Sequence, residues 1–231
     1  MIYLKTVSAL EKCFLDDDFA AKAPYTAGSA LRGDRLSYQI CLYDDGVGSA
    51  GKTVCRAAVD SPAAAWVQLS RVCHVPSQMP VFPDRHDEHY LRTAPGLYPD
   101  LLLPLTSNPN VYAVPRQLHS LWVDVRIPED AAPGVYPITV TLQSADGTAV
   151  GESRFTLTVR RTLLPEQTLL YTQWFHGDCL ASYYGVEVFS PEHWRIMENF
   201  LRTAADNGVN MILTPVFTPP LDTAVGHSSD L

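Results

Sequence analysis

Hydrophobic and polar residues alternate along much of the first 164 residues of this chain. In Leu121–Ile127, the odd-numbered positions are Leu, Val, Val and Ile, whereas Trp122, Asp124 and Arg126 occupy the even-numbered ones. A period of two places successive side chains on opposite faces of a strand, so the pattern predicts a strand with one buried face. Similar patterns predict further strands at Leu36–Tyr43, Thr53–Val59, Trp66–Val72, Tyr136–Gln143 and Arg154–Arg160.

Turn signals between these segments favour an all-β arrangement. Asp146-Gly147 separates the last two predicted strands and is a favoured hairpin turn. Tyr136 follows the turn residues Pro133-Gly134, and it either closes the edge of the fold as a tyrosine corner or is an ordinary core tyrosine. Short strands separated by turns predict an antiparallel β-sandwich over residues 1–165.

One segment is dense in proline. Eight of the eighteen prolines lie in Pro76–Pro115. Proline lacks a backbone donor and is disfavoured in central strands, so we expect a long excursion or an edge segment. Its many apolar residues favour packing against another domain over ligand binding.

After Pro165 the pattern changes to a strand–helix–strand order. Gln167–Phe175 and Val209–Phe217 are apolar with little alternation, as is typical of buried parallel strands. Ser190–Asn207 is predicted to be a helix, with a Ser-Pro start and a stop at Gly208. Its apolar stripe consists of Trp194, Met197, Phe200, Leu201, Ala204 and Ala205. Residues 166–231 are therefore predicted to be the incomplete start of an α/β barrel, since a whole barrel needs about 250 residues.

Composition argues against several classes of partner. The net charge of −8 and the pI near 5.3 disfavour nucleic acids and anionic membranes, which both attract a basic surface. Residues 1–19 lack the apolar core of a signal peptide, and no apolar stretch is long enough to span a membrane. We therefore expect a cytoplasmic protein that has no membrane partner.

The cysteines favour a reducing compartment. Their number is odd and no CxxC spacing occurs, so neither a disulfide framework nor a zinc knuckle is indicated. Buried thiols are the expected state of all five: Cys13, Cys41, Cys55, Cys73 and Cys179.

Polar and aromatic residues follow the two predicted barrel strands, where barrel enzymes keep their active sites. Trp174, His176 and Asp178 follow the first strand, with Tyr183 a few residues beyond, and Thr214 lies at the end of the second. Histidine and aspartate can hydrogen-bond sugar hydroxyls, and aromatic rings can stack on a pyranose. Alternatively, the polar residues cap the loop, the aromatic rings fill the core, and Thr214 is simply part of a loop.

Two other polar clusters do not match a catalytic or metal motif. His86-Asp87-Glu88-His89 has neither the HExxH spacing nor another firm zinc pattern, so a solvated loop is expected. Asp16-Asp17-Asp18 is expected to be a solvated turn. Neither a cofactor nor a metal is indicated by the sequence.

The run from Tyr171 to Gly226, which begins YTQWFHGDCLASYYG, resembles bacterial proteins of the glycoside hydrolase family 123 type. Four earlier segments fit the amino-terminal sandwich of the same family: Ser8–Phe14, Gly33–Gln39, Tyr90–Leu105 and Leu121–Pro128. The resemblance implies a sandwich followed by a (β/α)8 barrel that removes terminal N-acetylhexosamine residues with retention, as β-N-acetylgalactosaminidases do. The residues from His227 onward depart from the family's pattern.

The resemblance also implies where the chemistry resides. In the family, an adjacent Asp-Glu pair on a later barrel strand acts on a substrate whose own acetamido group is the nucleophile, so no enzyme nucleophile is needed. That pair has no counterpart in these 231 residues, so the chain alone is expected to be inactive. The resemblance assigns a role to four residues of this chain only, which would line the substrate pocket: Trp174, His176, Asp178 and Thr214.

Two alternatives to an enzyme portion remain open from the sequence. One is a non-catalytic carbohydrate-binding sandwich, which needs exposed aromatic residues such as Trp66 or Trp122. The other is a scaffold that packs on the barrel, in which case exposed barrel strands would promote self-association.

Overall fold

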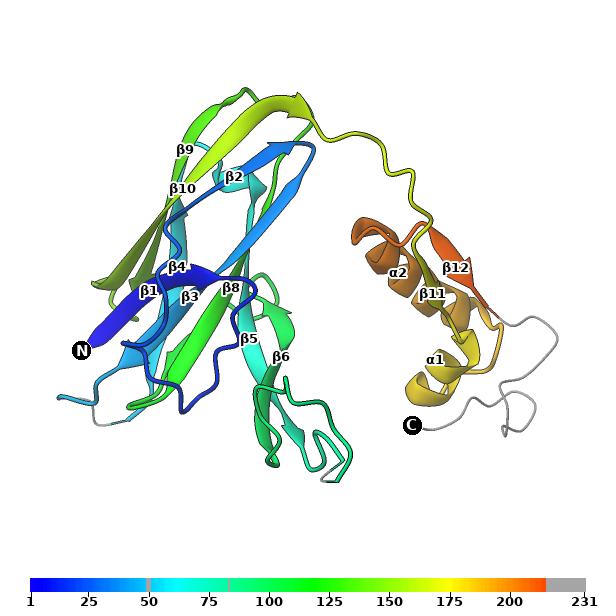
Figure 1. Ribbon diagram of the computed structural model, residues 1–231, viewed down its shortest axis with the longest axis horizontal. Coiled ribbons are helices and arrows are strands. Elements are labelled where there is room, and N and C mark those ends of the chain that lie inside the picture. The colour runs from blue at the N-terminus through cyan, green and yellow to red at the C-terminus, as the bar shows by residue number, and fades with distance from the viewer. Residues whose placement is uncertain (49–50, 83, 215–231) are drawn as a thin grey trace. The chain divides into compact units, whose positions relative to one another are not determined.

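The chain divides into two compact units, Met1–Leu164 and Pro165–Leu231. The computed structural model describes residues 1–48, 51–82 and 84–214 (Figure 1). The division falls where the alternating pattern of the first unit ends.

The first unit consists of two five-stranded sheets. The first sheet has the strand order β1-β3-β8-β5-β6, and the second has the order β2-β10-β9-β4-β7. Its elements are β1 (Ile2–Ser8), β2 (Ala27–Arg32), β3 (Arg35–Asp44), β4 (Thr53–Asp60), the 3-10 helix η1 (Ala64–Trp66), β5 (Val67–Ser77), β6 (Gly96–Pro104), β7 (Val111–Ala113), β8 (Leu118–Arg126), β9 (Gly134–Gln143) and β10 (Ala149–Leu163). All six predicted strand segments overlap observed strands, and the hairpin at Asp146-Gly147 joins β9 to β10.

The two sheets pack face to face and enclose the main hydrophobic core (Figure 1). Leu121, Val123 and Val125 of β8 are fully buried there, as the alternation predicted. Across the interface, the ring of Tyr38 on β3 stacks on that of Phe155 on β10, with centroids 4.0 Å apart and planes 12° apart. Burying each such side chain contributes about 1.5–3 kcal/mol, so this interface stabilises the unit.

The outer face of the first sheet is covered as well. Cys41 of β3 lies on the face that the alternation assigned to polar residues, yet it is fully buried. It belongs to a small cluster with Val7, Cys13 and Leu118, which we call the outer cluster. Gln39, on the same face, donates a hydrogen bond to the carbonyl oxygen of Glu11 (2.7 Å). The prediction that only one face of β3 is buried was therefore wrong, because residues 9–26 fold back over this sheet.

The prediction of purely antiparallel strands is corrected at one edge. β2 pairs with β10 in parallel, with Ala27 opposite Thr156 and Ala30 opposite Val159. The other strand pairs of the two large sheets are antiparallel. A hairpin forces its strands to be antiparallel, but no turn links β2 to β10, so the sequence between them does not constrain their direction.

Two tyrosines close strand edges in the same way. Tyr136, at the start of β9, donates a hydrogen bond of 2.6 Å to the carbonyl oxygen of Ala132, four residues earlier. This is the backbone bond expected of a tyrosine corner. Tyr98 in β6 donates an identical 2.6 Å bond to the carbonyl oxygen of Ala94. Both tyrosines end an Ala-Pro-Gly-x-Tyr sequence, so the repeated motif forms a repeated local structure.

The proline-rich segment contains the edge strand β6 and the short strand β7. Pro99 and Pro104 lie in β6, which pairs only with β5 in the described part of the sheet. An edge position tolerates residues without a donor, in agreement with the prediction of an edge segment. Several apolar side chains of this segment are exposed: Met79, Phe82, Tyr90, Leu91, Leu97, Leu101 and Leu102.

The second unit contains the predicted helix α2 (Pro191–Asp206) and, before it, α1 (Gly177–Tyr184), which was not predicted. Ser190 is the N-cap of α2, and its hydroxyl accepts a hydrogen bond from the backbone N–H of His193 (3.2 Å). Gly208 has a φ of 90° after the last turn, as expected for a glycine stop. The boundaries and caps of α2 thus follow the predicted pattern closely.

The two predicted barrel strands are shorter and more exposed than expected. β11 (Thr172–Trp174) and β12 (Met211–Leu213) form a parallel pair of three residues each, and their side chains are exposed. Before Thr172, a side chain adds to the backbone pairing: the Asn210 side-chain oxygen accepts a hydrogen bond from the N–H of Tyr171 (2.8 Å). The prediction that both strands are buried was wrong, since the described part of this sheet has only two strands to cover each other. Residues 215–217 of the second predicted strand lie outside the described part of the chain.

A pair of histidines sits within the first sheet. His119 on β8 lies beside His74 on β5, with ring centroids 6.2 Å apart. Burial, together with the positive potential of His74 and Arg71, lowers the pKa of His119 to about 4. A histidine with a lowered pKa stays neutral in the folded state while the unfolded chain takes up a proton, so it destabilises the fold in acid.

We expect the first unit to lose stability as the pH falls from about 6.5 towards 4. Above pH 7, His119 is neutral in both the folded and the unfolded state, so its contribution to the free energy of unfolding does not change with pH. Between pH 7 and pH 5, urea unfolding should show a loss of about 1–2 kcal/mol that the variant His119→Leu lacks. An equal acid-induced loss in both proteins would contradict the assignment to His119.

Candidate substrate-binding site

The two strands of the second unit end side by side. β11 and β12 are parallel, and their last pair is Trp174 opposite Leu213. The N–H of Phe175 donates to the carbonyl oxygen of Leu213 (2.8 Å), which extends the pairing by one step. His176, two residues after β11, and Thr214, directly after β12, therefore lie at the same carboxyl-terminal edge.

Trp174 and His176 form the aromatic part of this edge. Their rings are stacked, with centroids 6.0 Å apart and planes 15° apart. The Trp174 side chain is 70% exposed, so its ring presents a flat apolar surface to solvent. The Nδ1 atom of His176 is buried and has no hydrogen-bond partner among the residues that the structure describes. Buried polar atoms are normally paired, so we expect the partner of this nitrogen to lie outside the described residues.

Asp178 supplies an acceptor two residues beyond His176 in the chain. His176 is the N-cap of α1, and Asp178 is the acidic residue of its first turn. A carboxylate is favourable there because the N-terminus of a helix carries partial positive charge. Trp174, His176 and Asp178 are alternate residues of one short segment, so the structure keeps them close together.

Tyr183 lies at the other end of α1. Five residues of helix separate it from Asp178, which corresponds to about 7.5 Å along the helix axis. Its side chain is 83% exposed and its ring lies edge-on to that of Tyr184, with centroids 5.0 Å apart. The structure therefore places Tyr183 apart from the strand ends, and Thr214 beside them.

His193 on α2 fixes the position of α1, a role that sequence reasoning missed. It is completely buried, and its Nδ1 accepts a hydrogen bond from the N–H of Phe189 (2.9 Å). Its Nε2 lies 2.6 Å from the carbonyl oxygen of Gly177 and therefore carries the proton. Gly177 also lies close to Met197, since a β-carbon there would stand 2.7 Å from the sulfur. The only sequence signal was a histidine three residues after the N-cap.

The arrangement suits a neutral polar ligand with one apolar face. Trp174 offers a stacking surface, His176 offers an unused ring nitrogen, and Asp178 offers an acceptor. No group of three or more His, Cys, Asp or Glu side chains within residues 1–48, 51–82 and 84–214 is arranged to hold a metal ion.

The two other polar clusters lie in the first unit. The His86–His89 segment is exposed, in agreement with the predicted solvated loop. Asp17, by contrast, is not simply solvated: it pairs with Lys22 (2.8 Å) and with Arg92 (2.8 Å). The prediction of a solvated turn was wrong at this residue, because a nearby lysine and an arginine 75 positions away both pair with it.

We expect His193→Ala to loosen the second unit while leaving the sandwich intact. The change leaves the Phe189 N–H and the Gly177 carbonyl without partners and opens a cavity, at a cost of roughly 2–4 kcal/mol. Hydrogen exchange measured by peptide should speed up in α1 and α2 but not in β3 or β8. Arg195→Ala, an exposed change on the same helix, is the matched control. Unchanged exchange in α1 would refute this role of His193.

Comparisons with known proteins agree with the sequence resemblance. Residues 174–231 match the family model described as glycoside hydrolase 123, catalytic domain. No curated protein matches this chain. A solved family 123 glycoside hydrolase from Clostridium perfringens, studied for glycolipid glycan hydrolysis, has a TM-score of 0.67 at 14% identity. The alignment covers 88% of this chain and 36% of that structure, so this chain spans about a third of its length.

Other solved structures are less similar. AvmM, which catalyses macrocyclization in alchivemycin A biosynthesis, has a TM-score of 0.35 at 10% identity and covers 73% of this chain and 92% of its own. A sialic acid binding region of a Streptococcus sanguinis adhesin has a TM-score of 0.34 at 16% identity, covering 67% and 33%. Neither score is high enough to inform the fold. The family 123 structure shows a shared fold, and with the catalytic-domain match it identifies this chain as a protein similar to family 123 glycoside hydrolases.

Proposed function

We propose that this chain is the amino-terminal portion of a glycoside hydrolase that cleaves O-glycosidic bonds in N-acetylhexosamine-containing glycans. The observation that carries the proposal is the match of residues 174–231 to the family 123 catalytic domain. In this proposal, residues 1–165 form an accessory β-sandwich domain, and residues 166–231 begin a (β/α)8 barrel. The parallel pair β11–β12, connected through α1 and α2, is compatible with such a beginning.

The strand ends would contact the sugar. Trp174 would stack on the apolar face of the pyranose through its exposed ring. His176 would bond a hydroxyl through its free Nδ1, and Asp178 would accept from a hydroxyl or from the acetamido N–H. Thr214 would line the same edge, and Tyr183 would contribute only to a more distant part of a bound glycan.

The acids that break the glycosidic bond would come from elsewhere in the enzyme. Asp87-Glu88 is an adjacent acid pair, but it lies on an exposed loop of the first unit. Substrate-assisted hydrolysis requires a general acid and a residue that orients the acetamido group. We therefore assign no catalytic residue to this chain and expect it to leave a para-nitrophenyl N-acetyl-β-galactosaminide intact. Turnover that depends on this chain would disprove that assignment.

The carbohydrate would be this chain's principal partner, without nucleic acid or membrane. Within the described residues, no helix has the length and apolar character needed to cross a membrane. The cytoplasmic location, which was inferred from the lack of a signal-peptide pattern and of a membrane-spanning stretch in the sequence, remains a prediction. Exposed Leu169, Trp174 and Leu213 support self-association of the isolated chain through its barrel strands, which sedimentation would detect.

A carbohydrate-binding sandwich is less well supported. That alternative needs an exposed aromatic platform on a sheet face. Trp66 is instead half-buried against the core and packs on Tyr136, with ring centroids 4.9 Å apart. Trp122 is also only partly exposed.

Titration of the chain with N-acetylgalactosamine tests the proposal. The four tryptophans give four indole N–H signals by NMR, and each is assigned by its loss in a Trp→Phe variant. We expect a saturable shift of the Trp174 signal, because the sugar stacks on that ring. The affinity should be weak, in the millimolar range, since only part of the pocket is present.

Two controls define the result. His176→Ala should weaken the Trp174 shift several-fold, whereas Arg195→Ala should leave it unchanged. A saturable shift confined to Trp66 or Trp122 would support the sandwich-binding alternative. No shift of any indole signal up to high sugar concentration would reject the proposed sugar contact at the strand ends.

A further inference from the structure

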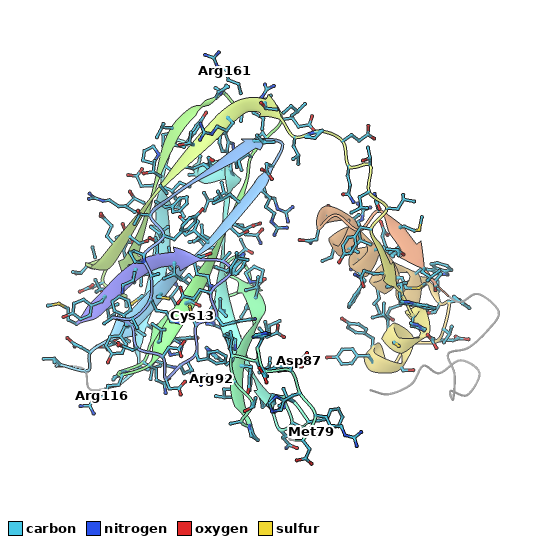
Figure 2. The ribbon with its side chains drawn as sticks, viewed as in Figure 1. Cys13, Met79, Asp87, Arg92, Arg116 and Arg161 are labelled. Carbon is cyan, nitrogen blue, oxygen red and sulfur yellow. The ribbon has the colours of Figure 1, made fainter. Side chains whose placement is uncertain are left out.

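Two cysteine thiols meet beneath the segment of residues 9–26. The sulfur atoms of Cys13 and Cys41 are 3.4 Å apart, and the residues are 2% and 0% exposed. Cys13 belongs to that segment, whereas Cys41 lies in the middle of β3. Figure 2 labels Cys13 among the side chains at the first sheet. The proposed sugar site uses neither thiol.

The two cysteines differ in how firmly their backbones are held. Cys41 is paired with Lys5 of β1 on one side and with Ser120 of β8 on the other. The segment that carries Cys13 has neither strand nor helix, and side chains such as Lys5 hold it, through a 2.6 Å bond from Nζ to the carbonyl oxygen of Phe19. A disulfide has an S–S distance of about 2.05 Å, so the sulfurs need to approach by about 1.4 Å. A shift of the segment can supply this movement.

We propose that Cys13 and Cys41 are a redox-sensitive pair that a low-molecular-weight disulfide, such as oxidised glutathione, converts to a disulfide fastening the 9–26 segment to β3.

The reaction is an exchange in two steps. When the 9–26 segment opens locally, the Cys13 thiolate attacks one sulfur of the small disulfide, forms a mixed disulfide and releases one small thiolate. The Cys41 thiolate then attacks the Cys13 sulfur, and the second small thiolate leaves. The two protein thiols lose two electrons and two protons in total, and the small disulfide takes them up as two thiols.

The surroundings favour Cys13 as the attacking group. The hydrogen bond with Cys41 lowers the pKa of the Cys13 thiol, and the positive charge of Lys22 acts in the same direction. The same hydrogen bond and burial raise the pKa of Cys41. Cys41 loses its proton more readily once Cys13 is in the mixed disulfide and no longer carries a negative charge.

The Cys13–Cys41 disulfide would fix a segment that lines a surface pocket. A pocket of about 470 Å³ is lined by residues of this segment and by Arg92 of the proline-rich excursion. Arg92 pairs with Asp16 (2.6 Å) and Asp17 (2.8 Å) of the segment, and in Figure 2 it is labelled on the same unit as Cys13. Oxidation would therefore restrain local opening of both loops.

The test incubates the folded chain with oxidised glutathione until its thiol count is constant. After free thiols are blocked, peptide mapping without reductant should show the Cys13 peptide joined to the Cys41 peptide, two hydrogen atoms lighter than the reduced pair. The linked protein should melt roughly 5–10 °C higher, since the bond closes a loop of about 28 residues in the unfolded chain. Reductant should reverse both changes.

Variants distinguish this pair from general thiol oxidation. Cys73→Ser should keep both the linked peptides and the rise in Tm. Cys13→Ser should lose both, and Cys41→Ser serves as the second variant should one of them fold poorly. The proposal is overturned if wild-type protein stays folded with Cys13 and Cys41 both reduced, or if Cys13 remains only as the glutathione adduct.

Discussion

The contact between the inner faces of the two sheets is the interaction on which the first unit depends. Tyr38 and Phe155 stack across it at 4.0 Å, and the buried side chains of β8 and β9 surround them. An aromatic stack adds about 0.5–1.5 kcal/mol beyond the burial of its area. The contact also determines strand register, because a shift of one residue would turn every inward side chain of a strand towards solvent.

Local sequence patterns predicted those parts of the structure that depend on residues close together in the chain. The strand β8, the β9–β10 hairpin and the caps of α2 all follow from spacing within a few residues. The outer cluster was not predictable in this way, because Cys41 is buried by residues 9–26 and not by its own strand neighbours. The parallel pairing of β2 with β10 likewise depends on packing between segments that are far apart in sequence. The pairing of Asp17 with Arg92 spans 75 positions and has the same cause.

The shared edge on which His176 and Thr214 lie could be predicted from the sequence, but the contacts that hold the neighbouring helix α1 in place could not. The strand-end rule selected Trp174, His176 and Thr214, and the parallel register places His176 and Thr214 at one edge. Helix α1 was missed because its eight residues are too few for a helical period to be clear. Its position depends on His193, whose ring bonds the carbonyl of Gly177. A buried histidine with both nitrogens used acts here as a structural connector, and it orients the segment that carries His176 and Asp178.

The second unit differs from the first in where its apolar surface lies. A parallel pair of three-residue strands is too small to be stable alone, so side chains reinforce it, as when Gln167 bonds the carbonyl of Gly208 (3.1 Å). Its strands still expose Met211 and Leu213, the kind of apolar area that further strands would cover. In a barrel, the strands that cover this surface also bring their own carboxyl ends to the same edge. The apolar surface of β11 and β12 and their shared carboxyl-terminal edge would then be covered by the same neighbouring strands.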